Sequence, residues 1–216
     1  MSYFSIHIIP VTPLQQNCTL LFDNERKVGV LVDPGGDWPR VQEVIQKKGI
    51  IVEAIWITHG HVDHAGAAMQ AKEALNVKII GSHCDDKPVM DAAHKSAQSY
   101  GITDARICIP DRWLEDGDSV HFAGHVFKVF HTPGHSPGHV IYFNETARFA
   151  ILGDVLFRGF IGRTDLPFCS HEELMKSLKE KILPLGEDVR FICGHGPQSS
   201  LGYELQHNPF LQGLYR

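Results

Sequence analysis

Short apolar runs of four to six residues recur along the chain and alternate with longer amphipathic segments. Runs of this length, rich in Val, Ile and Phe and bounded by turn residues, are typical of β-strands. We therefore expect strands at residues 4–9, 19–22, 28–32, 54–57, 77–80, 119–122, 126–130, 140–143, 149–152 and 189–193. The polar residues 24–27, between the second and third runs, are typical of a hairpin turn.

The amphipathic segments predict helices at about residues 39–48, 65–75, 86–100 and from Ser170 onward. We expect Asp37 to cap the first helix and Gly49 to end it, because Asp favours helix starts and Gly favours helix ends. Ser170 should cap the last helix, where acidic residues in the first turn and lysines in the last match the helix dipole. Strands interleaved with helices in this way are consistent with two sheets packed face to face and helices outside.

A cluster of metal-ligand side chains follows the strand expected at residues 54–57. Four such side chains lie within six positions: His59, His61, Asp63 and His64. Two imidazoles two residues apart can converge on one cation, and the Asp–His pair can turn to a second cation beside it. This spacing suits a loop leaving a strand, whereas pairs on a helix are usually four residues apart. The alternative, a polar loop with surface histidines, would leave this concentration of ligands around Gly60 unexplained.

Three further strand ends carry the same kind of side chain. His135, Asp154 and His195 each follow an expected strand, and each comes directly after a glycine. Strand ends fix the position of a ligand, and glycine lets the backbone approach a crowded centre. A lone His or Asp in such a place is more often a capping or hydrogen-bonding residue. Three of them beside the first cluster favour a centre for two metal ions.

These motifs resemble the signature of the metallo-β-lactamase fold, in which His-x-His-x-Asp-His is followed by separate His, Asp and His ligands. Every ligand position is present, and the resemblance extends from Pro10 to Glu204. Within that superfamily the chain is most similar to small bacterial glyoxalase II-like hydrolases, through residues 32–37, 153–157, 162–165 and 195–197. The resemblance implies an α/β fold, the αββα sandwich of two mixed sheets with helices outside. It also implies that residues 1–216 form one domain, without an added C-terminal helical domain.

The resemblance further implies which residues bind metal. One ion would be held by His59, His61 and His135 and the second by Asp63, His64 and His195, with Asp154 bridging both. Asp63 and Asp154 would then be the catalytic carboxylates. We expect two divalent ions per chain, with zinc the first expectation, although iron and manganese also suit these ligands. Such a pair lowers the pKa of a water from about 15.7 to about 7 and stabilises an oxyanion.

The implied reaction is hydrolysis of a small-molecule thioester, from S-2-hydroxyacylglutathione and water to glutathione and a 2-hydroxy acid. A thiol of pKa about 8.5 can leave without a proton donor, and the sequence contains no obvious spare acid. Arg163 matches a basic position that contacts the glutathione part in glyoxalase II enzymes, so we expect it to bind substrate. A surface pair between Arg163 and Asp165 is the alternative. Asp33 and Thr58 are expected to orient the metal loop through hydrogen bonds.

Composition narrows the classes of partner. The 216 residues are 43% hydrophobic and 21% charged, as in a soluble globular protein, and the net charge is −5. No block of Lys and Arg marks a nucleic-acid surface, and no apolar run approaches the roughly 18 residues of a membrane span. Five widely spaced cysteines without a Cys-x-x-Cys argue against a disulfide framework. With an N-terminus unlike a secretory signal, these features predict a cytoplasmic protein.

Other functions compete with the thioester hydrolase. Persulfide dioxygenases resemble the chain in fold, size and residues 162–165, but use one iron at the positions of His59, His135 and Asp154. The tail at residues 194–197 favours the hydrolase. A secreted β-lactamase does not fit the missing signal, a nuclease does not fit the missing basic surface, and a non-catalytic binding protein would be expected to have lost ligands.

Overall fold

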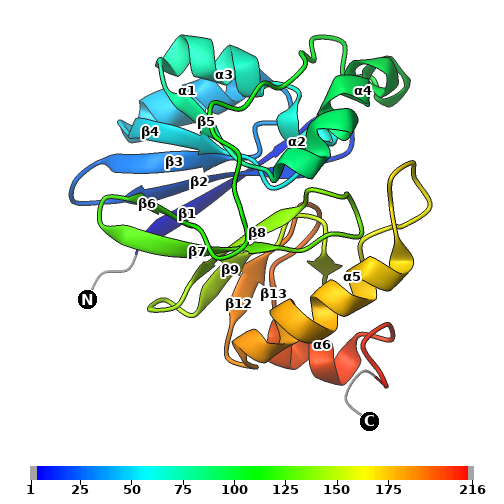
Figure 1. Cartoon of the computed structure of the whole chain (residues 1–216). Helices are drawn as coiled ribbons and strands as arrows, with labels where there is room; N and C mark the ends of the chain where they lie inside the picture. Colours follow the sequence, from blue (N-terminus) through cyan, green and yellow to red (C-terminus); the bar gives the residue numbers. More distant parts are fainter. Residues whose placement is uncertain (1–3, 214–216) are drawn as a thin grey trace.

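Two β-sheets lie face to face at the centre of the structure, and helices cover both outer faces (Figure 1). The structure is a computed structural model that describes residues 4–213. Within them, the N-terminal sheet has the strand order β1-β2-β3-β4-β5 and the C-terminal sheet the order β13-β12-β9-β8-β7-β6. Both sheets contain parallel and antiparallel pairs. The expected sandwich of two mixed sheets with outer helices is confirmed.

The N-terminal sheet is built from β1 (Ser5–Val11), β2 (Gln16–Asp23), β3 (Val28–Val32), β4 (Ile51–Trp56) and β5 (Lys78–Ile80). The C-terminal sheet is built from β6 (Ser119–Phe122), β7 (His125–His131), β8 (Val140–Asn144), β9 (Phe149–Ile151), β12 (Arg190–Ile192) and β13 (Ser199–Ser200). A separate hairpin pairs β10 (Leu156–Phe157) with β11 (Phe160–Ile161). The α-helices are α1 (Trp38–Lys48), α2 (Val62–Ala65), α3 (Ala68–Leu75), α4 (Lys87–Ala97), α5 (His171–Ser177) and α6 (Leu201–His207).

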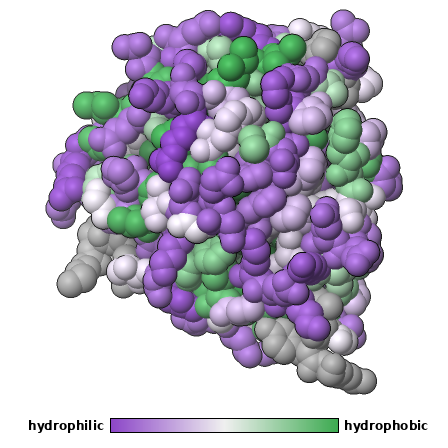
Figure 2. All heavy atoms as spheres, viewed as in Figure 1, coloured by the Kyte–Doolittle hydropathy of each residue, from purple (hydrophilic) through white to green (hydrophobic). Residues whose placement is uncertain are grey.

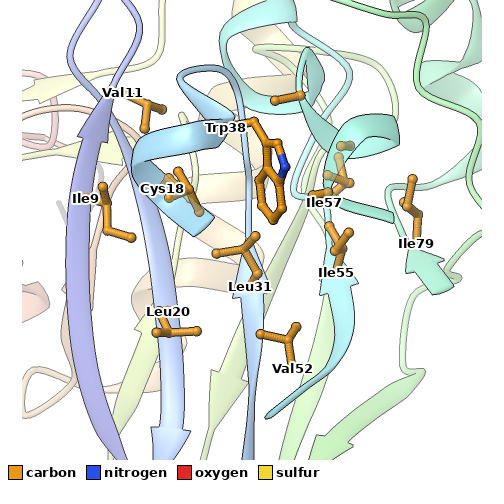
Figure 3. Close-up of a cluster of buried hydrophobic side chains, with 14 of the residues drawn as sticks. Ile9, Val11, Cys18, Leu20, Leu31, Trp38, Val52, Ile55, Ile57 and Ile79 are labelled. Atoms are coloured by element: carbon orange, nitrogen blue, oxygen red, sulfur yellow. The ribbon is translucent and has the colours of Figure 1, made fainter. Parts of the chain in front are cut away.

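Neighbouring residues of β2 pack into two different hydrophobic cores. Leu20 of β2 packs with Trp38 of α1 on the outer face of the N-terminal sheet (Figure 3). Leu21 points the other way and packs with Phe127 and Tyr142 of the C-terminal sheet. Successive side chains of a strand point to opposite faces, so a strand that is buried on both faces contains a continuous apolar run. This explains why the strands were recognisable as unbroken runs.

The outer face of the C-terminal sheet is buried by the last helices. Phe143 and Phe191 from the sheet pack against Leu174 of α5 and Leu201 of α6. The side chain of Ser170 accepts a hydrogen bond from the backbone N–H of Glu173, so the expected cap of α5 is present. A π-helical turn at Leu178–Ile182 continues α5 along the sheet. The packed sheets support the loops at the ends of their strands, and these loops carry the candidate metal-ligand side chains.

The helix expected at residues 65–75 begins later, at Ala68, and a separate short helix precedes it. Residues Val62–Ala65 form α2 and Ala68–Leu75 form α3, with a break between them. At the break, the backbone N–H of Ala67 donates to the carbonyl of Pro34, outside the helix. The predicted start was wrong because helix propensity does not register this tertiary hydrogen bond, whereas the predicted end at Leu75 is confirmed. The break places two of the expected metal ligands on a short helix of their own.

The expected capping role of Asp37 is also corrected. Asp37 precedes α1, but its side chain makes no capping hydrogen bond. Its carboxylate instead accepts from the backbone N–H of Thr12, at 2.8 Å. Gly49 ends α1 in a left-handed conformation, as expected. The hairpin of β10 and β11 and the helix α6 were not predicted, because their apolar patterns are too short to indicate an element.

No helix among residues 4–213 is long and apolar enough to cross a membrane. The face in Figure 2 is mostly hydrophilic, and its hydrophobic residues form separate groups. This surface agrees with the composition.

Candidate metal centre

All seven expected ligand side chains meet at one end of the sandwich. Three of them form a group of imidazoles: His59, His61 and His135. His61 Nδ1 lies 3.1 Å from His59 Nε2 and 3.0 Å from His135 Nε2. The three come from the loop after β4 and the loop after β7, so the two sheets supply this group together. We call it the three-histidine half.

A second group lies beside the first and contains a carboxylate. It consists of Asp63 and His64 on α2 and His195 after β12. His195 Nε2 lies 3.1 Å from Asp63 Oδ2, and His64 Nε2 lies 3.8 Å from the same oxygen. We call this group the carboxylate half.

The carboxylate of Asp154 lies between the two halves. Its Oδ2 is 3.4 Å from His135 Nε2 and 3.7 Å from His195 Nε2. Its Oδ1 is 3.3 Å from His64 Nε2. A side chain at position 194 would have its Cβ 1.9 Å from Asp154 Oδ1, so glycine is required there for the backbone to pass. This arrangement allows one carboxylate to serve two ions.

Burial rules out the alternative of a surface loop. His59 and His64 are fully buried, and His135, Asp154 and Asp63 are 3%, 7% and 8% exposed. Buried polar groups are costly unless they are hydrogen-bonded or bind a metal. A concentration of buried imidazoles and carboxylates therefore points to a ligand site.

The two halves differ in their electrostatics. In the three-histidine half, burial lowers the pKa of all three imidazoles, and the pKa of His61 falls to about 3. In the carboxylate half, burial opposes the charged form of His64 and His195, but the neighbouring carboxylates outweigh it and raise the pKa of both. The pKa of Asp154 is lowered, because the nearby histidines, His64 above all, outweigh the opposing effect of burial.

The donor set fits divalent metal ions. His135 Nδ1 lies 2.9 Å from the carbonyl of Arg163, and a hydrogen bond donated there leaves Nε2 as a lone-pair atom facing the cluster. His64 Nε2 and Asp154 Oδ1 are buried and have no hydrogen-bond partner among the described residues. Lone pairs that face one another at about 3 Å repel unless a proton or cation lies between them. The His/Asp cluster is thus compatible with a dinuclear metal centre.

Asp33 and Thr58 support the ligands in the way expected. The Asp33 carboxylate accepts from the backbone N–H of Thr58 at 2.7 Å and from its hydroxyl at 2.6 Å. It also accepts from His64 Nδ1 at 2.9 Å, which turns Nε2 of that ring toward the centre. His139 is buried beside the cluster, where its Nε2 accepts from the backbone N–H of Asp154 at 3.0 Å. It therefore orients a ligand from behind.

A cavity of about 910 Å³ opens over the centre. Both halves contribute to its lining, through His61 and His135 on one side and Asp63 and His195 on the other. Its walls are largely apolar and include Val89, Phe157, Phe160, Leu166 and Phe168. Three cationic side chains also line it: Lys95, Arg158 and Arg163. An apolar cavity with a few polar groups is the usual form of a small-molecule site.

Arg163 has a partner of its own. Its guanidinium forms two hydrogen bonds with the Asp165 carboxylate, at 2.7 and 2.9 Å. The surface pair that the sequence left open is therefore present. Both side chains are more than half exposed, and exposed ion pairs contribute only about 0–1 kcal/mol. The pair is weak enough for a substrate carboxylate to displace Asp165.

Comparison with known proteins places the chain in a family. Residues 11–195 match the Metallo-beta-lactamase superfamily. The chain belongs to this superfamily. It is a hydrolase of the metallo-β-lactamase fold. Its two sheets and its His/Asp cluster agree with this membership.

Individual relatives cover almost the whole chain. Hydroxyacylglutathione hydrolase GloC of Haemophilus influenzae is 41% identical over 208 residues, which are 96% of this chain and 98% of the relative. Among solved structures, BLEG-1 B3 metallo-beta-lactamase is 35% identical with a TM-score of 0.89, covering 97% of this chain and 100% of that one. TTHA1623, solved in a di-iron-bound form, is 38% identical with a TM-score of 0.86, covering 95% and 100%.

Sequence reasoning missed a further polar residue of this superfamily site. Asp86, at the start of α4, is fully buried and accepts hydrogen bonds from the backbone N–H groups of Gly60 and Gly138. An aspartate at a helix start is ordinarily a cap, so the sequence carried no sign of this role.

Proposed function

We propose that this chain is a dinuclear-metal thioester hydrolase of glyoxalase II type. It would convert an S-2-hydroxyacylglutathione and water to glutathione and a 2-hydroxy acid. The observation that carries the proposal is the position of the Asp154 carboxylate, within 3.7 Å of histidine nitrogens from both halves. The similarity to a hydroxyacylglutathione hydrolase at 41% identity supports this reaction over others of the superfamily.

The ligand assignment follows the two halves. We assign one ion to the three-histidine half, the other to the carboxylate half, and Asp154 to both. When bound, the ions would lower the pKa of a water and polarise the thioester carbonyl. Zinc is our first expectation, and the di-iron form of TTHA1623 keeps iron as the alternative. The role of the chain is to hold seven donor atoms in place in a largely buried site.

The cavity supports a thioester more than an amide. Outside the metal cluster, its titratable side chains among the described residues are Lys95, Tyr100, Arg158 and Arg163. None of the four is a carboxylic acid or an imidazole, the groups that most often act as general acids. His139, the imidazole closest to the cluster, is committed to the backbone of Asp154. A thiolate can leave without a proton, whereas an amide nitrogen cannot.

We further propose that Arg163 binds a carboxylate of the thiol part of the substrate. Its guanidinium lies on the cavity wall and would exchange Asp165 for the substrate. Lys95 and Arg158 add positive charge to the same cavity, which suits an anionic conjugate. We also propose, from the sequence, that residues 1–216 act as a single domain in the cytoplasm.

Release of glutathione from S-D-lactoylglutathione tests the proposal. The protein should be purified without chelator, and its metal content measured on the same sample. His195→Ala, in the carboxylate half, should reduce both activity and metal content. His121→Ala is the matched control, since that histidine is exposed on β6. Absence of thiol release by the metal-loaded protein would refute the proposed function. Oxygen uptake on a persulfide with one iron per chain would favour the dioxygenase.

A further inference from the structure

Asp86 is a buried carboxylate with four hydrogen-bond donors around it. Its Oδ2 accepts from the backbone N–H of Gly60 at 2.6 Å and from the hydroxyls of Ser136 and Ser82 at 3.0 and 3.3 Å. Its Oδ1 accepts from the backbone N–H of Gly138 at 2.6 Å. The residue is 0% exposed. Hydrogen bonds to a charged acceptor are about twice as strong as neutral ones, so this carboxylate holds its donors firmly.

Three of the four donors belong to the two loops that supply the three-histidine half. Gly60 stands between His59 and His61, and Ser136 follows His135 directly. Ser82 is the only one of the four donors outside these loops, and none belongs to an element of the carboxylate half. One carboxylate therefore ties together two loops from different sheets.

The two loops pass close to Asp86 and α4 at their glycines. A Cβ at position 138 would lie 2.4 Å from the backbone nitrogen of Asp86. A Cβ at position 60 would lie 2.8 Å from Met90 Cγ, one turn further along α4. The backbone N–H of His83 also donates to the carbonyl of Gly138, at 3.0 Å. Glycines at both positions allow the loops to reach the carboxylate closely.

We propose that Asp86 is a positioning residue that sets the geometry and the affinity of the three-histidine half. It acts through the backbone of the ligand loops, without contact to an ion or to the substrate. The inference rests on the proposed function only in requiring that the chain bind two ions. It differs from the role of Asp33, which accepts directly from the imidazole of His64. Asp33 also accepts from the Thr58 hydroxyl, whose oxygen lies 3.0 Å from His59 Nδ1.

Asp86→Asn tests this role. An asparagine keeps the size of the side chain but turns one acceptor oxygen into an NH₂ group, which must face the N–H of Gly60 or of Gly138. Glu204→Gln is the matched control. Glu204 is also fully buried and accepts from the backbone of Gly159 and the side chain of Asn208, away from the ligand loops.

The readout is metal affinity, measured by chelator competition with zinc at pH 7.5. Burial raises the pKa of Asp86 to about 6, so the carboxylate is ionised under these conditions. Two backgrounds separate the halves: His195→Ala disables the carboxylate half, and His135→Ala disables the three-histidine half. In the His195→Ala background, Asp86→Asn should weaken zinc binding by about 10- to 100-fold, as is typical for residues that orient ligands. In the His135→Ala background it should change zinc binding by less than about twofold.

A general loss of folding gives a different result. It would weaken zinc binding equally in both backgrounds, and that outcome overturns the proposal. An unchanged zinc affinity of Asp86→Asn in both backgrounds overturns it as well. Should Asp86→Asn fail to fold, Ser136→Ala removes one donor and should weaken only the three-histidine half, by a smaller factor. An equal effect of Ser136→Ala on both halves overturns the proposal too. A parent protein that binds fewer than two ions would refute the dinuclear function instead, so the two failures are distinguishable.

Discussion

The three-histidine half and the carboxylate half of the centre each gather donor groups that could bind a cation, but their electrostatics are opposite. The first presents only neutral imidazoles, with pKa values lowered by burial. The second contains Asp63 and two imidazoles whose pKa values are raised by carboxylates. Exposure differs as well, since the His59 ring is buried while the side chain of His195 is 29% exposed at the cavity. Protons therefore compete with a cation more strongly in the second half than in the first.

Support differs in the same way. The three-histidine half is held from behind by Asp86, through backbone N–H groups. Rings of both halves are also held directly. In the first half, His135 Nδ1 donates to the carbonyl of Arg163. In the second, His64 donates to Asp33, and His195 Nδ1 lies 3.0 Å from the carbonyl of Leu14. The comparison teaches that support from Asp86 is confined to the first half, and that the second half contains His195, which is partly exposed at the cavity.

The largest effect is expected where the halves join. Asp154→Ala removes the carboxylate that lies within 3.7 Å of histidine nitrogens from both halves. We expect the loss of both ions and a fall in kcat/KM of at least about 10³-fold, the upper end for one electrostatic contact. Metal analysis and thiol release measure this. Retention of two ions by Asp154→Ala would contradict the claim that Asp154 joins the two halves, because each half would then bind its ion independently.

The pH dependence of metal affinity should separate the halves. Because the pKa values of His64 and His195 are raised, protons compete with metal there as the pH falls from 7.5 to 5.5. For each proton displaced, zinc affinity should fall by up to about tenfold per pH unit. The three-histidine half should change little over this range, because the pKa of His61 is only about 3. Chelator competition in the His135→Ala and His195→Ala backgrounds measures each half, and equal slopes would contradict the assignment.

The smallest of the three effects concerns Arg163, which contacts the three-histidine half and also lines the cavity. Its carbonyl accepts from His135 Nδ1, while its side chain lines the cavity. Arg163→Ala keeps the carbonyl, so metal content should not change. A guanidinium–carboxylate contact contributes about 1.5–3 kcal/mol, so kcat/KM for a glutathione thioester should fall by roughly 10- to 150-fold.

A thioester without the carboxylate is the control for that variant. The loss should shrink on it, and Asp165→Ala should leave the contact intact by freeing Arg163. Equal losses on both thioesters would mean that Arg163 supports the loop. No loss on either would leave Arg163 as a surface residue.

The sequence predicted the fold and the meeting of the seven ligands for a local reason. Each ligand follows an apolar run or lies in one nine-residue motif, and both features are visible in the sequence alone. Asp86 could not be predicted in this way, since three of its four donors lie 26, 50 and 52 residues away in the chain. The break between α2 and α3 has the same origin, a hydrogen bond to Pro34. Local patterns indicate the candidate metal ligands, whereas tertiary hydrogen bonds determine how those groups are held.

One measurement tests the central claim most directly: metal stoichiometry and thiol release on the same preparation, titrated from the apo protein. We predict that hydrolysis of S-D-lactoylglutathione appears as the second ion binds and is complete at two ions per chain, without oxygen uptake. Full activity at one ion per chain would contradict the dinuclear account. Oxygen consumption on a persulfide, with one iron and no thioester hydrolysis, would replace it with the dioxygenase.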